Sequence, residues 1–202
     1  MDAKAQLVFS LHTIGAIKFG AYKLKSGILS PFYLDLRILV SHPRVLRETA
    51  QVMAQLLTTL QFDRIAAIPY AALPIGTAVA LEMDRPLVYP RREKKDYGTG
   101  RADEGEYRAG ETIVVIDDVI TTGASKIEAI APLTLAKLKV RDIVVLVDRE
   151  QGGAQEIAKN GYQVHSIFKI TEMMRILEEA GKVTESQHQD VLTFLAQNGV
   201  QP

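Results

Sequence analysis

The chain has 202 residues, 47% of them hydrophobic, which is enough to bury a substantial core and fits one domain better than two. Its 24 basic and 24 acidic side chains balance, so the molecule as a whole lacks the positive field on which non-specific binding to nucleic acids depends. The absence of cysteine excludes disulfides, thiolate metal sites and cysteine nucleophiles.

The N-terminal segment, residues 1–40, differs from the rest of the chain. Lys4, His12 and Lys18 interrupt its apolar residues, so neither a signal peptide nor a membrane span is expected there, and we expect a cytoplasmic protein. A helical period over residues 7–14 gives way to strand-like segments at residues 19–25 and 32–36. We therefore predict a small N-terminal hood beside a main sheet.

The core, residues 41–180, alternates short apolar runs with segments of helical period. Runs that are apolar throughout are typical of parallel strands covered by helices on both faces. The pattern predicts an α/β fold with a central, mostly parallel sheet flanked by helices. The expected strands are residues 64–68, 86–89, 112–116, 142–147 and 163–168, and the expected helices are residues 43–60, 73–83, 123–137 and 153–160, followed by an amphipathic C-terminal helix within residues 181–202.

Residues 91–110 have no apolar period. They contain eleven charged residues together with Gly98, Gly100, Gly105 and Gly110, which predicts a long mobile loop. Loops of this length in a compact domain are usually lids or binding loops, or else disordered. On composition alone, a solvated charged loop is the favoured interpretation of the segment.

The strongest chemical signal is the apolar run at residues 113–116, followed by Asp117, Asp118 and a turn of small residues that leads into a helix. Ligands of open parallel sheets bind beyond the carboxyl ends of the strands, so both carboxylates are expected in the binding crevice. The amides of the turn, at a helix N-terminus, favour a phosphate. Acids beside a phosphate make sense if they face hydroxyls or hydrated Mg²⁺ on the same ligand, which points to a sugar phosphate. The structural alternative is an ordinary strand followed by a helix cap.

Residues 113–125 resemble the thirteen-residue signature with which type I phosphoribosyltransferases bind 5-phosphoribosyl pyrophosphate. The resemblance implies that Asp117 and Asp118 contact the ribose hydroxyls and that the turn holds the 5-phosphate. The implied donor site comprises Asp117, Asp118, Val119, Ile120, Thr121, Thr122, Gly123, Ala124 and Ser125.

Further segments resemble the orotate branch of that family. The N-terminal motif implies that Lys25 reaches the substrates and that Tyr33 and Leu34 stack on orotate. Arg149, at another strand end, matches the residue that recognises the carboxylate of orotate, a task suited to its planar fork. The alternative for Arg149 is a surface ion pair with Asp148 or Glu150.

The segment from Arg91 onward is similar to the catalytic loop of the family, which closes over the pyrophosphate of a neighbouring subunit. Arg91, Arg92 and Lys95 fall on its basic positions. Arg92 stands where lysine is common, and Tyr97 stands where many bacterial members have histidine. The form with Tyr97 resembles the orotate domain of eukaryotic bifunctional UMP synthases.

The segment at residues 67–76 is similar to the turn that seats pyrophosphate through backbone amides. This match is looser, because Ala67 replaces a glycine and Ala71 stands where family members carry lysine or threonine. Backbone contacts from Tyr70 and Ala71 are still expected.

Together these resemblances imply an orotate phosphoribosyltransferase that uses Mg²⁺, held mainly through the substrate, and forms a homodimer with shared sites. Lys95, Arg91, Asp117 and Asp118 are the expected catalytic residues. Two alternatives stay open: a regulatory module that binds the donor but has weakened catalysis, and a phosphoribosyltransferase for another base. The C-terminal segment also resembles the one that joins the two domains of bifunctional UMP synthases, so the chain could be part of a fusion with a decarboxylase.

Overall fold

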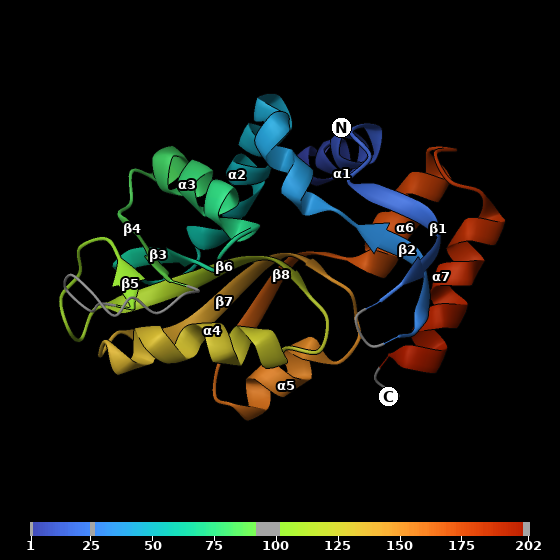
Figure 1. Cartoon of the computed structure of the whole chain (residues 1–202). Coiled ribbons are helices and arrows are strands. Elements are labelled where there is room, and N and C mark those ends of the chain that lie inside the picture. Colours follow the sequence, from blue (N-terminus) through green and yellow to red (C-terminus); the bar gives the residue numbers. More distant parts are fainter. Residues whose placement is uncertain (1, 25–26, 92–101, 200–202) are drawn as a thin grey trace.

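The computed structural model describes residues 2–24, 27–91 and 102–199. Its centre is a six-stranded sheet of order β5-β4-β3-β6-β7-β8, with α2 and α3 on one face and α4 and α5 on the other (Figure 1). All neighbouring strands are parallel except the antiparallel pair of β4 and the edge strand β5. The α/β fold with a mostly parallel sheet is confirmed. The strands are β3 (Arg64–Ala67), β4 (Leu87–Pro90), β5 (Asp103–Glu104), β6 (Thr112–Ile120), β7 (Lys139–Asp148) and β8 (Gln163–Lys169).

The apolar residues of β6 serve both faces of the sheet. Val114 and Ile116 join the hydrophobic cluster on the side of α2 (Pro43–Leu57) and α3 (Ala72–Met83). Ile113 and Val115 join the cluster formed with α4 (Ala124–Leu135) and α5 (Gly153–Lys159). Successive side chains of a strand point to opposite faces, so a strand buried on both sides is apolar throughout.

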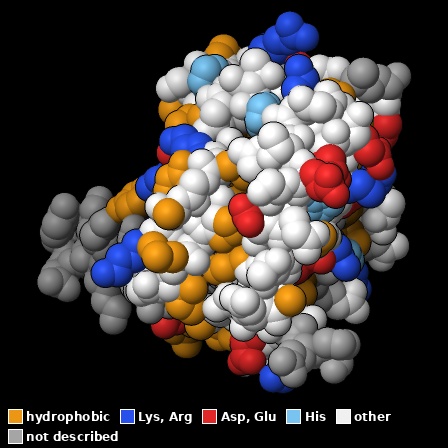
Figure 2. Space-filling view, turned by 90° about the vertical axis from the view of Figure 1, so that its right-hand side faces the viewer, with side chains coloured by type: hydrophobic (Ala, Val, Ile, Leu, Met, Phe, Trp, Pro, Cys, Tyr) orange, Lys and Arg blue, Asp and Glu red, His pale blue; other side chains and the backbone are white. Residues whose placement is uncertain are grey.

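The N-terminal hood begins with α1 (Ala3–Thr13) and continues as an antiparallel hairpin of β1 (Ile17–Lys23) and β2 (Leu29–Leu34). A short 3-10 helix, η1 (Leu36–Ser41), leads into the core. Two C-terminal helices, α6 (Ile170–Glu179) and α7 (Glu185–Asn198), lie at the same end of the molecule as the hairpin (Figure 1). Figure 2 looks onto this end and shows hydrophobic side chains interspersed with polar and charged ones.

Among the differences from the sequence expectation, three concern the main sheet and the helix that follows it. Strand β6 runs to Ile120 instead of ending at residue 116, so the acidic pair lies within the strand. Residues 103–104, predicted as part of a loop, pair with β4 as the edge strand β5. Helix α6 was not predicted, because it starts at Ile170 directly after β8 with no turn residue between them. In the described part of the chain, no helix is both long and apolar enough to cross a membrane.

Candidate active site

The two acids near the end of β6 have different surroundings. Asp117 is 3% exposed and forms an ion pair with Lys126 of the first turn of α4, and its Oδ1 accepts a hydrogen bond of 2.8 Å from the amide of Asp118. Asp118 is half-buried, and its Oδ1 accepts from the amide of Val119 at 2.8 Å. Burial raises the pKa of Asp117 to about 7, although Lys126 acts in the opposite direction. Asp118 is therefore the more accessible carboxylate of the pair.

Lys126 was not identified from the sequence. A cation in the first turn of a helix opposes the helix dipole, and a buried lysine is costly unless it is paired. Asp117 provides that partner, and both side chains are almost completely enclosed. No local pattern marks the pair, because the two residues come from different elements.

The turn after β6 leads into α4 through Gly123, which has a φ of +85°. A Cβ at this position would lie 2.9 Å from the carbonyl oxygen of Gly153, so a larger residue meets both backbone strain and a clash. Because the cap residue has no side chain, no side-chain cap bonds the first amides of the helix at this end. The predicted seat for a phosphate, residues 121–125, is thus a glycine turn at the N-terminus of a helix.

A cavity of about 480 Å³ brings several predicted site residues together. Tyr70 and Ala71 approach it from the turn between β3 and α3, and Asp118 and Ser125 from the end of β6 and the start of α4. Arg91 lines it from the end of β4, where its guanidinium is paired with Glu104 of β5 and its amide donates to the carbonyl of Ala102 at 2.7 Å. The donor signature, the expected pyrophosphate turn and the first basic residue of the expected loop therefore border one space.

Arg149 follows β7 and is 6% exposed. Its Nη2 donates to Ser30 Oγ at 3.1 Å, and its Cζ lies 4.4 Å from the ring centroid of Phe32. Its Nε has no hydrogen-bond partner among the residues that the structure describes. Burial lowers its pKa to about 10, which leaves the guanidinium charged at neutral pH.

The alternative of an ion pair with the flanking acids is wrong. Asp148 accepts from the amide of Glu150 at 2.7 Å, and Glu150 accepts from the amide of Thr171 at 3.0 Å. Across residues 2–24, 27–91 and 102–199, no carboxylate pairs with Arg149. A buried cation of this kind is suited to an anionic ligand.

Tyr33 and Leu34 lie on β2 and are half-buried. The Tyr33 ring stacks at a tilt on Tyr22, with centroids 5.5 Å apart, and its hydroxyl accepts from Arg37 Nη2 at 2.8 Å. The phenol of Tyr33 opposes the effect of burial on the pKa of Arg149. The predicted site residues Lys25, Arg92, Lys95 and Tyr97 lie outside the described residues.

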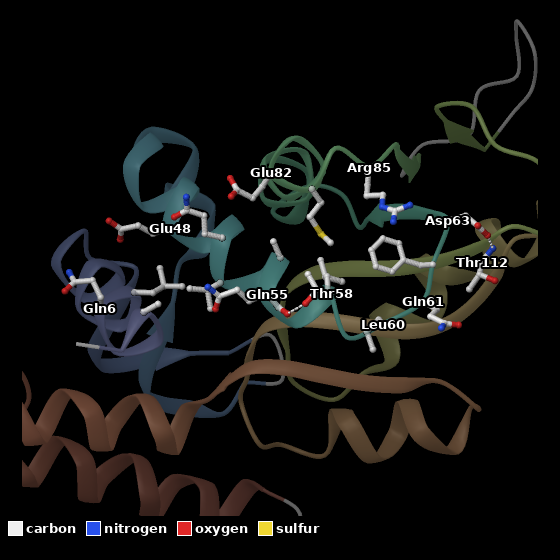
Figure 3. A pocket seen from close by; sticks show the side chains of 18 residues that line it. Gln6, Glu48, Gln55, Thr58, Leu60, Gln61, Asp63, Glu82, Arg85 and Thr112 are labelled. Carbon is white, nitrogen blue, oxygen red and sulfur yellow. Dashed lines mark hydrogen bonds between the residues drawn. The ribbon is translucent and has the colours of Figure 1, made fainter.

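A larger hollow, of about 1140 Å³, lies elsewhere. It is bordered by α1, α2, the end of α3, the segment that precedes β3 and the first residue of β6, where Asp63 accepts from the amide of Thr112 at 2.7 Å (Figure 3). These are the amino ends of the strands, whereas ligands of open α/β sheets bind at the carboxyl ends. The candidate active site is therefore the smaller cavity beside the acidic pair.

Comparison with known proteins agrees with this geometry. The model of the phosphoribosyl transferase domain matches residues 36–179. An orotate phosphoribosyltransferase of Pyrobaculum islandicum is 37% identical over 185 residues, which cover 91% of this chain and 95% of that relative. The chain belongs to the orotate phosphoribosyltransferase family.

Longer proteins also match most of this chain. The bifunctional enzyme PyrF/PyrE of Nostoc sp. is 39% identical over 181 residues, or 90% of this chain and 38% of that protein. A structure of UMP synthase from Leishmania donovani superposes with a TM-score of 0.90 at 42% identity, covering 97% of this chain and 43% of that one. The chain therefore spans less than half the length of these two relatives.

Proposed function

We propose that the chain transfers the 5-phosphoribosyl group of 5-phosphoribosyl pyrophosphate to orotate, giving orotidine 5′-monophosphate and pyrophosphate in pyrimidine biosynthesis. The observation that carries this proposal is Arg149, a buried cation without a carboxylate partner among the described residues, at the strand end next to the acidic pair. The carboxylate of orotate supplies the missing anion. The name of the Pyrobaculum relative supports the same acceptor.

Each group in the proposed site has a separate task. The amides of residues 121–125 bind the 5-phosphate, Asp118 accepts hydrogen bonds from the ribose hydroxyls, and Arg149 orients orotate through its carboxylate. The orotate N1, which arrives as an anion, attacks C1 of the ribose as the bond to pyrophosphate breaks. No protein nucleophile takes part, so the catalytic effect comes from positioning and electrostatic stabilisation.

The leaving pyrophosphate carries several negative charges, and we assign its stabilisation to Arg91, Arg92 and Lys95. Donors that gather around a developing charge lower the barrier most when water is excluded. Arg91 already lines the cavity, but its ion pair with Glu104 must open or be shared before its guanidinium reaches the leaving group. For Arg92 and Lys95, the role in stabilising pyrophosphate is proposed from the sequence alone.

Mg²⁺ is the proposed cofactor. Among the described residues there is no cluster of three or more histidine, aspartate or glutamate side chains that could hold a metal ion. Mg²⁺ commonly keeps several waters and binds through one or two carboxylates and substrate phosphates, so Asp118 and the donor together fit it. When bound, it would neutralise charge on the pyrophosphate.

We also propose that two copies of the chain form the working unit. The proposal rests on the resemblance of the segment after Arg91 to a loop that closes over a neighbouring subunit. The concentration dependence of turnover, measured beside sedimentation at the same concentrations, tests it. Loss of activity on dilution in step with dissociation is expected, and full activity of a monomer contradicts it. A cytoplasmic location stays a prediction.

The acceptor and the activity are tested with a panel of bases in a pyrophosphate-release assay. Release with orotate and not with adenine, guanine, hypoxanthine or uracil is the expected result. Release with a purine instead supports the alternative of another acceptor. Donor binding without release for any base supports the alternative of a regulatory module.

A further inference from the structure

The backbone of Arg149 contacts the main sheet, whereas its side chain contacts the N-terminal hairpin. Its amide donates to the carbonyl of Ile120 at 3.0 Å, at the end of β6. Its guanidinium reaches β2, where it contacts the Ser30 hydroxyl and the face of the Phe32 ring. Within the described part of the chain, the guanidinium has a single hydrogen bond and an Nε without a partner, so its stacking on Phe32 largely sets its orientation.

The C-terminal helix α7 packs against Phe32. Phe32 is 0% exposed, and the ring of Phe194 in α7 meets it edge-on, with centroids 6.0 Å apart and planes at 88°. Phe194 is 6% exposed. Edge-to-face pairs at this distance are favourable and fix the tilt of both rings. The orientation of Phe32 therefore depends on a residue more than one hundred and sixty positions away in the chain.

The same helix also touches the backbone beside Arg149. At the end of α7, the space beside Gly199 is closed by the carbonyl oxygen of Glu150, which lies 3.0 Å from the place of a Cβ. The start of α7 is fixed to α6 by a contact of 2.6 Å between His188 Nδ1 and Glu178 Oε2, and by a capping box at Thr184. The start of α7 is thus anchored, and its end lies close to the backbone beside Arg149, while Phe194 packs on Phe32.

We propose that Phe194 is a positioning residue for the acceptor site, which acts on Arg149 through the ring of Phe32. This inference rests on the proposed function, because it assigns the orientation of the cation that binds orotate. Preorganisation of a binding group raises affinity by lowering the ordering cost of binding. The contact from α7 thereby sets the affinity for the acceptor and leaves the donor site at residues 121–125 unaffected.

The test is a steady-state comparison of Phe194→Leu with the wild-type chain. We expect KM for orotate to rise about 2- to 10-fold, the size of one lost aromatic pair, with KM for the donor within about twofold. Phe194→Met, whose thioether fills more of the space left by the ring, repeats the measurement if the leucine variant fails to fold. The matched control is Leu192→Ala on the same helix, 37% exposed, for which no change is expected.

A double-mutant cycle identifies the route. In the Phe32→Leu background, Phe194→Leu should have no further effect on KM for orotate, because the ring through which it acts is gone. The inference is overturned if both Phe194 variants keep the wild-type KM, if both substrates are affected equally, or if the two substitutions add. Failure of the proposed function is distinct from these results, because the wild-type chain would then release no pyrophosphate with orotate.

Discussion

Replacing Arg149 with methionine separates binding from stability at the proposed acceptor site. Arg149 is 6% exposed, and its guanidinium stacks on Phe32 with 4.4 Å between Cζ and the ring centroid. Methionine keeps much of the length of the side chain, and its sulfur also packs favourably against an aromatic ring. The substitution thus removes the charge and the donors while it leaves the packing largely intact.

The size of the effect follows from the surroundings of the guanidinium. Loss of one partner of a buried, hydrogen-bonded charge pair costs about 2–5 kcal/mol, which corresponds to a roughly 30- to 4000-fold loss of affinity. We therefore expect kcat/KM for orotate to fall at least about 30-fold, with KM for the donor changed by less than about twofold.

In contrast to its activity, the thermal stability of the Arg149→Met variant should not fall. No described carboxylate pairs with Arg149, and Ser30 keeps its own hydrogen bond of 2.7 Å to the carbonyl of Phe32 when the arginine is removed. Because an unpaired buried cation is costly, Tm should stay level or rise. The control is Arg175→Met, which removes an exposed cation paired with Glu179 at 2.8 Å and should leave both kinetics and Tm nearly unchanged.

Calorimetric unfolding and steady-state kinetics on the same preparations decide the matter. An Arg149→Met variant that uses orotate as well as the wild type refutes the assignment of the acceptor site. A variant that loses activity together with several degrees of Tm refutes the reasoning as well, since the arginine would then serve the fold.

Three further predictions concern the donor site. Gly123→Ala should lower the free energy of unfolding by about 1–3 kcal/mol in urea titrations and weaken donor binding, whereas Gly161→Ala, at a similar φ of +84° but in open space, should lose less stability and keep the donor. The pKa of Asp117 is about 7, above its unfolded value, so the folded state keeps a proton that the unfolded state releases, and this group lowers stability as pH rises toward 7. Between pH 7.5 and pH 5.5, the free energy of unfolding of the wild type should rise more than that of Asp117→Asn, by up to about 1.4 kcal/mol for each pH unit below the pKa of Asp117. Equal rises in the two proteins contradict this prediction. Asp118→Asn should raise KM for the donor by about tenfold or more and leave Tm within a few degrees, and an unchanged KM removes Asp118 from the ribose contact.

The sheet could be predicted because burial on both faces leaves a direct mark on the sequence. The uninterrupted apolar residues of β6 and β7 indicate parallel strands covered by helices, and both strands are present. The acidic pair and the glycine turn were visible for a similar reason, since their chemistry depends on adjacent residues. The local pattern did not predict the end of β6, because Val119 and Ile120 continue the strand beyond the two acids.

Features that depend on distant residues could not be predicted. Nothing in the sequence around Lys126 indicates that it pairs with Asp117, because a lysine in a first helical turn is normally solvated. Arg149 has an acid on each side in the sequence, which kept an ion pair open, but both acids bond backbone amides instead. Strand β5 has only two residues and exists through its pairing with β4.

Helix α6 is a different kind of omission, because its signal was present. Ile170, Met173, Met174 and Leu177 follow the spacing of a buried helical face, and all four are buried. The helix begins with no turn residue after β8, so its first residues extend an apolar strand and hide the boundary. An abrupt change of period within an apolar run is therefore the feature that marks it.

The central claim is that one site holds a ribose phosphate at the glycine turn and an orotate carboxylate at Arg149. A crystal structure of the chain with orotidine 5′-monophosphate tests both halves at once. We predict the 5′-phosphate on the amides of residues 121–125, the ribose hydroxyls at Asp118 and the base carboxylate on the guanidinium of Arg149. A nucleotide bound in the large hollow beside α2, or one with its carboxylate away from Arg149, would contradict the account.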